Sequence, residues 1–437
     1  MKTLKILATA ILLGGVSFAS PATAAVKSGT ACSQVNQRTN QAGYTYTCIN
    51  SGKKLVWSKG VPTVVPIPSL TAKSAFLDAQ KCQLNQTVSM TPPFSLGFIR
   101  DPMWAPTHGT LNVAVVYLSY LDGTINPNAM KEMTTIQEPR TSAFYAASSF
   151  GKFQVHFLDA HKVYTIQKNL LGYNLKDNAP DMSIIFSDAM TAAQSDYDFT
   201  KVDALAIVLP DNLPVVDIGP NYGMQVTVGG ATITRGFDMT YINPNPVNHR
   251  VIDDGWLTHE LGHTLGLTHP YLTSMPGPVY AWDVMQYDNS AAPDLFAWEK
   301  YILGWIDDSQ VDCLAAPLNQ KVQVYLSSSG LSDSSTKLLM YRLSDSQAIV
   351  VESRRKSSIN PLTSTQEGVL VYKLDVNKGF GQGAITLNYL NAQIAHTKYG
   401  DEMYGSLQQG DSVMSDGVTI TVLKHANGGD YVSISKS

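Results

Sequence analysis

One stretch of the sequence carries residues whose types and spacing could hold a catalytic metal ion. It reads HELGHTLGLTH over residues 259–269. Four residues apart on a helix, His259 and His263 share one face, so both imidazoles can bind a single ion. Gly266 can adopt the left-handed backbone that ends a helix, which lets the chain turn and bring in His269 as a third ligand. Three protein ligands with one open position are typical of catalytic rather than structural zinc.

Glu260 supplies the carboxylate that hydrolysis at such a site needs. It lies about 100° around the helix from His259. We therefore expect it to hold a water molecule beside the metal and to act as the general base. The alternative is an ordinary helix in which these residue types occur together by chance. Gly266 and His269 stand at the spacing that a third ligand requires, which favours the metal site. The remaining histidines show no comparable spacing and are expected on the surface or in the core: His108, His156, His161, His249, His396 and His425.

The elements that must position this motif read as a sheet with helices. Short, apolar, β-branched runs at 111–118 and 204–209 predict buried strands. The alternating run 153–157 predicts a strand covered on one side, and 141–150 predicts a helix that packs through its aromatic residues. The segment 232–242 could form the edge strand of the cleft, where an extended peptide could dock. The alternative is that this segment pairs internally.

Downstream of residue 308 the helical signals fade. Short strands separated by Gly, Ser and Asp turns predict a β-sandwich. The expected strands are 321–326, 337–341, 348–352, 368–374 and 418–423. No acidic cluster there indicates Ca²⁺. In the region before it, Asp196, Asp198 and Asp203 are a candidate calcium group, against a plain solvated turn.

The amino terminus predicts a signal peptide. Lys2 and Lys5 precede an apolar run at 6–18, and the small residues at 22–24 match a signal peptidase site. The mature chain is then expected to begin at Ala25. Because no cysteine follows the cut and no later run is long enough to span a membrane, we expect a secreted, extracellular protein without a membrane anchor.

Export permits disulfides, and the four cysteines can pair in three ways. The nearest pair, Cys32 with Cys48, is the first choice. Cys82 with Cys313 would then tie the segment before the catalytic region to the segment after it. An alternative is that Cys82 caps the metal in a latent form, although nothing around it supports that role.

Residues 25–60 read as a small module of their own. Two β-rich runs at 44–49 and 55–58 are joined by a polar turn and predict a hairpin. So short a sheet needs a covalent cross-link to be stable, which a disulfide between Cys32 and Cys48 would supply. The module could bind something at the cell surface, but a spacer role is favoured. Three prolines in the following residues predict a stiff linker.

Composition excludes some partners. The chain has 437 residues, 44% of them apolar and 15% charged, which suits a globular protein with a sizeable core. Its formal net charge of -4 provides no basic field. We therefore expect no binding to nucleic acid or to an anionic membrane.

The pattern HExxHxxGxxH resembles the signature of the metzincin metallopeptidases. The resemblance extends to 282–287, which is similar to the Met-turn below the metal in that family. It implies that Met285 forms the floor of the site. In the astacin and serralysin branches a tyrosine two residues after this methionine can ligate zinc or stabilise the oxyanion. The resemblance implies that role for Tyr287, with simple packing under the site as the alternative.

Within the metzincins, the chain is most similar to the bacterial secreted immune-inhibitor-A-like metallopeptidases. The resemblance covers roughly residues 100–425 and leaves out the module at 25–60. It is carried by separate pieces at 111–118, 148–152, 203–205, 282–285, 295–305, 351–354 and 367–375.

This resemblance and the patterns above predict an α+β fold. A metzincin-like catalytic domain, with a twisted mixed sheet and an active-site helix, would be followed by a β-sandwich and preceded by the disulfide-stapled β module. The expected divisions are a signal peptide at 1–24, the module at 25–60, a Pro-rich linker at 61–72, the catalytic domain at 73–310 and the C-terminal β-sandwich at 311–437.

The expected function is that of a secreted, monomeric zinc endopeptidase that acts on extracellular proteins or peptides. Zinc would lower the pKa of water to about 7, with Glu260 as base. A competing interpretation is a catalytically idle scaffold that binds surface glycoproteins for adhesion. The intact set of catalytic residue types argues against it. Zinc hydrolysis of a non-peptide substrate is a third, less favoured interpretation.

Overall fold

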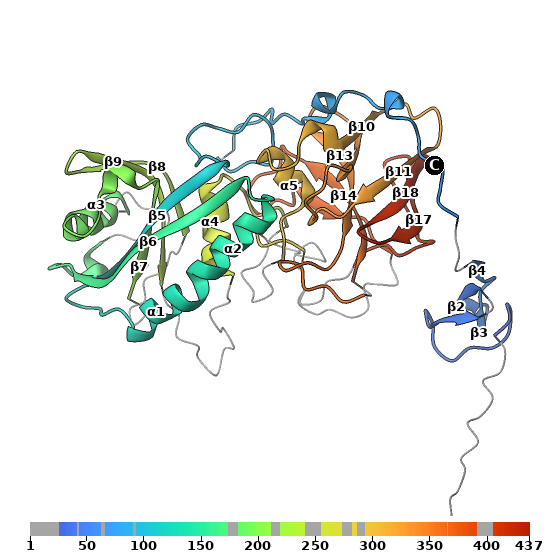
Figure 1. Ribbon diagram of the computed structural model, residues 1–437, viewed down its shortest axis with the longest axis horizontal. Coiled ribbons are helices and arrows are strands. Elements are labelled where there is room, and N and C mark those ends of the chain that lie inside the picture. The colour runs from blue at the N-terminus through green and yellow to red at the C-terminus, as the bar shows by residue number, and fades with distance from the viewer. Residues whose placement is uncertain are drawn as a thin grey trace, which may run out of the picture. The chain divides into compact units, whose positions relative to one another are not determined.

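The computed structural model describes most of the chain and divides it into two compact units, Met1–Pro66 and Ile67–Ser437 (Figure 1). The described residues are 26–41, 43–62, 66–90, 93–173, 182–210, 219–240, 255–272, 282–285, 293–364, 366–390 and 405–437. The signal-peptide prediction lies outside them. Among these residues, no helix is both long and apolar enough to cross a membrane.

The first unit contains a small antiparallel sheet. β2 (Tyr44–Ser51) pairs with β1 (Arg38–Gln41) and β3 (Lys54–Trp57), and β4 (Val61–Pro62) also pairs with β2. The hairpin predicted over 44–58 is therefore present. A disulfide joins Cys32 to the fully buried Cys48 of β2, which confirms the first predicted pairing.

The second unit begins with a mixed sheet in the order β6-β5-β7-β9-β8. β5 (Gly109–Ser119) runs parallel to β6 (Phe153–Thr165) and to β7 (Ala204–Leu209). β9 (Ala231–Thr240) runs parallel to β7, whereas β8 (Gly219–Val228) is antiparallel to β9. The fold class is α+β, as predicted.

Both faces of this sheet are covered, which explains the unbroken apolar runs in its sequence. Alternate residues of β5 enter two separate cores: Val113 and Val115 lie in one, Ala114 and Val116 in the other. The first core contains residues of α2 and α4, and the second contains residues of α3. The helices of this region are α1 (Pro127–Glu132), α2 (Glu138–Ser148), α3 (Met182–Ala193), α4 (Trp256–Thr264) and α5 (Ala297–Ile302).

The expectation of a cleft edge at 232–242 is wrong for its described part. β9 lies between β7, which pairs with its residues 236–240, and β8, which pairs with its residues 231–238, so it is an inner strand. The edge strands of this sheet are β8 and β6. A strand sequence of this kind suits an inner and an edge position equally well, so only its pairing with distant segments determines which position it takes.

The C-terminal region forms two further sheets. One has the order β10-β12-β13-β14-β15 and the other β11-β18-β17-β16. The predicted strands correspond to β11 (Val322–Ser327), β12 (Leu338–Arg342), β13 (Gln347–Arg354), β14 (Gly368–Asp375) and β17 (Val418–Ala426). The strands that the sequence patterns missed are β10 (Val311–Ala315), β15 (Ile385–Leu387), β16 (Ser412–Ser415) and β18 (Gly429–Lys436).

The first of these sheets is buried on both faces. Leu339 and Val351 belong to a core shared with the second sheet. Their neighbours Met340 and Val350 join the core that also holds Leu261 of α4. The C-terminal strands are thus packed against the region that carries the histidine motif.

A second disulfide reinforces this junction. It joins Cys82, at the end of a short 3-10 helix, to Cys313 in β10. This confirms the predicted pairing, and it rules out the alternative in which the Cys82 thiolate caps a metal ion.

Candidate metal centre

Helix α4 places His259 and His263 in the interior of the second unit. Leu257 and Leu261, four residues apart, are fully buried on its apolar side. Neighbouring helix α2 holds it in place, because the Tyr145 hydroxyl donates a 2.6 Å hydrogen bond to the Thr258 carbonyl oxygen. α4 is too short to be stable by itself in water, so packing against its neighbours stabilises it.

The end of α4 is a Schellman motif built on Gly266. The Gly266 N–H bonds the His263 carbonyl at 2.8 Å, and the Leu267 N–H bonds the Gly262 carbonyl at 3.1 Å. Gly266 has a φ of +86°, and a Cβ there would lie 2.6 Å from Cδ1 of Trp104. Both the backbone angle and the contact exclude a side chain. The chain consequently turns back toward the helix and carries His269 with it.

Gly266→Ala is expected to cost more stability than Gly230→Ala. Both glycines have a φ of +86°, but a Cβ at Gly230 meets nothing within 4 Å. The Gly230 variant should lose about 1–2 kcal/mol from left-handed strain alone. The Gly266 variant should lose a further ~1–3 kcal/mol through overpacking on Trp104. Urea unfolding of both variants checks this. Equal losses of stability in the two variants would show that Trp104 moves aside without an energetic cost.

Three imidazole rings converge beside this turn. The ring centroids of His259, His263 and His269 lie 4.8–4.9 Å apart, a nearly equilateral triangle. Nε2 of His269 lies 2.8 Å from Nε2 of His259 and 3.1 Å from Nε2 of His263. The three could hold one metal ion, and they are the group among the described residues in which at least three ligand atoms come close enough.

Backbone carbonyls fix the tautomers of two of these rings. Nδ1 of His259 lies 2.7 Å from the Val284 carbonyl oxygen, and Nδ1 of His263 lies 2.8 Å from the Leu267 carbonyl oxygen. A carbonyl only accepts, so each Nδ1 carries the proton and each Nε2 presents a lone pair. Lone pairs aimed at a common point repel one another unless a cation lies between them.

The spacing and charge state of the three rings fit a tetrahedral zinc ion. Zn–N bonds of about 2.0–2.1 Å place neighbouring ligand atoms roughly 3.3 Å apart, near the observed Nε2 separations. Burial lowers the pKa of His263 and of His269 well below the ordinary histidine value, and the charge of the neighbouring histidines lowers both further. Neutral imidazoles are the form that binds metal.

The other predicted site residues lie as follows. Glu260 is buried in α4 directly after His259. Met285 is fully buried against the same helix, because a Cβ on Gly262 would lie 2.2 Å from its sulfur. Tyr287 lies outside the described residues.

A buried carboxyl pair under Met285 was not found from the sequence. Asp283 accepts hydrogen bonds from the backbone N–H of Met285 and of Phe296, at 2.6 and 2.7 Å. It also shares a hydrogen bond with Glu299 of α5, and both acids are completely buried. Burial, and then the charge of Asp283, raise the pKa of Glu299 well above its usual range. Glu299 is therefore the proton donor of the pair.

Arg354 of β13 connects the backbone at 294–295 to the C-terminal sheet. Its guanidinium donates to the Glu352 carboxylate at 2.5 Å and to the backbone oxygens of Asp294 and Leu295 at 3.0 and 2.9 Å. All of these groups lie in the interior, where an unpaired charge would be costly. The chain just before α5 is thus held by a residue of β13.

Glu299→Gln is expected to make the free energy of unfolding fall less steeply as the pH rises. In the folded protein Glu299 keeps its proton to a higher pH than in the unfolded chain. As pH rises above the ordinary glutamate value, the unfolded state releases that proton first, so the free energy of unfolding falls. Glutamine keeps a donor toward Asp283 and cannot ionise. Its stability relative to wild type should rise with pH by up to ~1.4 kcal/mol per unit, measured by urea unfolding from pH 4 to 8. Parallel profiles would contradict a protonated Glu299.

The candidate calcium group does not form. Asp196 bonds Lys162 and Tyr164, Asp198 caps its own 3-10 turn, and Asp203 accepts from the Asn112 N–H. Each carboxylate serves a separate local contact, and the three do not meet the proximity that a metal group requires among the described residues. That prediction is wrong for these residues.

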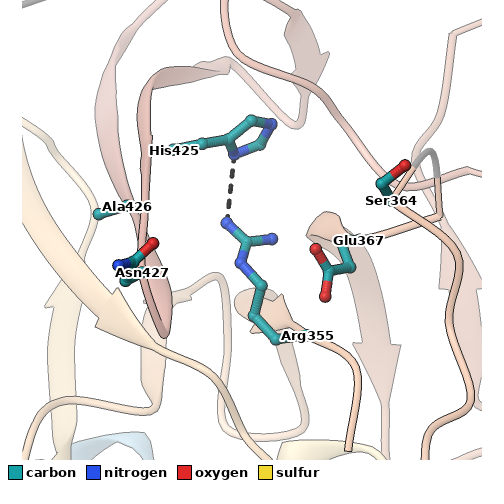
Figure 2. A pocket seen from close by; sticks show the side chains of 6 residues that line it. All are labelled: Arg355, Ser364, Glu367, His425, Ala426 and Asn427. Atoms are coloured by element: carbon teal, nitrogen blue, oxygen red, sulfur yellow. Dashed lines mark hydrogen bonds between the residues drawn. The ribbon is translucent and has the colours of Figure 1, made fainter.

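A polar hollow of about 230 Å³ lies in the C-terminal region, and its lining does not include His259, His263 or His269. Figure 2 shows the Arg355 guanidinium reaching toward His425, with Glu367 beside it. These groups are already paired within the protein: Arg355 and His425 both contact Asp430, and Glu367 accepts from the Lys356 N–H at 2.8 Å. Each of these three side chains therefore has a partner within the protein.

No family model and no curated protein matches the sequence. Wild-type OgpA from Akkermansia muciniphila aligns over 67% of this chain and 95% of its own, at 13% identity and a TM-score of 0.30. Catalytically inactive OgpA in complex with an O-glycopeptide substrate, glycodrosocin, aligns over 67% and 94% at 12% identity and the same TM-score. Similarity at this level does not establish a shared fold.

Proposed function

We propose that the protein is a secreted zinc-dependent endopeptidase of the metzincin type. The observation that carries the proposal is the convergence of three imidazole rings, those of His259, His263 and His269, on one point. Backbone carbonyls fix the tautomers of His259 and His263, and burial keeps His269 neutral. Zinc, when bound there, supplies Lewis acidity that acidifies water and polarises a peptide carbonyl.

The chain's own residues would perform the proton transfers. Glu260 takes a proton from the attacking water and later passes it to the departing amine. Carbonyl acceptors at Val284 and Leu267 keep two imidazoles oriented throughout. We retain Met285 as the floor of the site, and Tyr287 as a candidate donor to the oxyanion.

The proposed enzyme acts outside the cell. The signal peptide at 1–24 would direct export, and the two disulfides suit an oxidising, extracellular location. The proposed enzyme consists of a spacer module at 25–60, a linker at 61–72, a catalytic domain at 73–310 and a β-sandwich at 311–437. Substrates would be proteins or peptides, and the enzyme would act as a monomer.

Hydrolysis of casein or gelatin, with and without a chelator, tests the proposal. Purified protein should contain about one zinc ion per chain and should degrade the substrate. Chelation should abolish degradation, and added zinc should restore it. A zinc-loaded protein that binds glycoproteins but leaves both substrates intact would favour the adhesion alternative.

A further inference from the structure

The loop between β14 and β15 reaches from the C-terminal sheet to the third histidine. Its backbone pairs with the segment that carries His269: the Gly381 N–H bonds the His269 carbonyl at 3.1 Å, and the Gly383 N–H bonds the Tyr271 carbonyl at 2.8 Å. Leu272 and Gln382 form an antiparallel bridge. The position of His269 is thus tied to a loop more than a hundred residues away in the sequence.

The same loop is anchored on a second side. The Asn377 side chain accepts from the Thr87 N–H at 2.8 Å and donates to the Thr87 hydroxyl at 2.8 Å. Gly379 approaches Met90 so closely that a Cβ would lie 3.3 Å from its sulfur. Two independent anchors hold the tip of the loop in one place, so the side chain at that tip is pre-organised.

That side chain is Phe380. Its ring centroid lies 4.0 Å from the ring of His269, with 31° between the planes, and 5.9 Å from the ring of His263. Phe94 adds a further aromatic ring at 6.3 Å from Phe380. Phe380 nevertheless remains 38% exposed.

Phe380 packs on the most exposed of the three histidines. His259 and His263 are only 6% and 1% exposed, whereas His269 is partly exposed. Of the three ligand residues, His269 is therefore the one that solvent reaches most. The Phe380 ring is packed on His269 and is itself partly exposed, so a substrate bound at the cluster would meet its apolar face.

We propose that Phe380 is a specificity-determining residue: its ring forms the apolar wall of a substrate subsite and selects a bulky apolar side chain next to the scissile bond. This inference rests on the proposed peptidase function. A rigid aromatic wall favours side chains that bury surface against it, and it offers nothing to a charged one. The C-terminal sheet would then contribute directly to substrate choice.

Cleavage profiling of a denatured-proteome peptide library tests the inference. Wild type should enrich bulky apolar residues at one position flanking the cleaved bond. Phe380→Ala should reduce that enrichment about 10-fold or more, since one methylene in an apolar pocket is already worth about 10-fold. Phe380→Trp should shift the preference toward smaller side chains. Leu331→Ala is the matched control, because Leu331 is 37% exposed and should leave the profile unchanged.

The zinc content of each variant is measured alongside, by metal analysis. A weakened preference for bulky side chains in Phe380→Ala and a shift toward smaller ones in Phe380→Trp, both at wild-type zinc content, would support the wall, because a merely structural role would not make the profile depend on the size of this side chain. An unchanged profile in both active variants would overturn it. Loss of zinc in both would also overturn it, since Phe380 would then only support His269. A wild-type protein that holds zinc and cleaves no peptide would overturn the proposed function itself.

Discussion

Replacement of Glu260 by glutamine is expected to lower peptide hydrolysis by about 10²- to 10⁴-fold, the usual contribution of a general base. Glutamine has nearly the same shape but cannot take a proton from water. The three histidines are untouched, so the zinc content should stay at the wild-type value. Initial rates on a fluorogenic peptide and metal analysis of the same preparation check both statements.

The matched control is Glu299→Gln. Glu299 is also a buried glutamate on a short helix, but its raised pKa means that it already carries a proton. The isosteric amide should therefore change hydrolysis at neutral pH little. Near-normal turnover in the Glu260 variant would contradict its role as base. Equal losses in the two variants would indicate damage to the fold instead of to the proton transfer.

His263→Ala is expected to abolish both metal binding and hydrolysis. Loss of a group that merely orients a ligand commonly costs 10- to 100-fold in metal affinity, so loss of a ligand should cost more than about 100-fold. His263 is 1% exposed, between Leu267 and the ring of Phe94. Its removal also leaves a cavity. His263→Gln, which keeps more of the volume, should show the same loss of metal with a smaller loss of stability.

Thermal unfolding provides a readout that does not depend on activity. Zinc binds the folded state, so chelation should lower the Tm of wild type. Both His263 variants should unfold at the same temperature with and without chelator. His156→Ala, on the exposed surface of β6, should respond to chelator as wild type does. A His263 variant that retained one zinc ion per chain would remove His263 from the ligand set.

Some features of the site are predictable because they depend on local backbone geometry. A spacing of four residues puts His259 and His263 on one helix face whatever surrounds the helix. Gly266 ends α4 because the left-handed angle is open to glycine. The buried strands β5 and β7 follow from continuous β-branched runs.

Other features depend on pairing between distant segments. β10 is recognised as a strand only through its parallel pairing with β12, and β15 has three residues and no pattern of its own. β9 became an inner strand because β8 pairs with it. The proton shared by Asp283 and Glu299 exists because two segments are packed together away from water.

The amino-acid sequence alone determined which residues could bind a metal, and the helix and turn that present them, because these depend on rotations within about ten residues. Only the tertiary structure decided how His269 is held, which carbonyls orient the other two rings, and that Phe380 lies beside them. Those arrangements arise from contacts between α4, the segment at 282–285 and the β14–β15 loop. No local pattern encodes such contacts, since burial and strand pairing are properties of the folded chain.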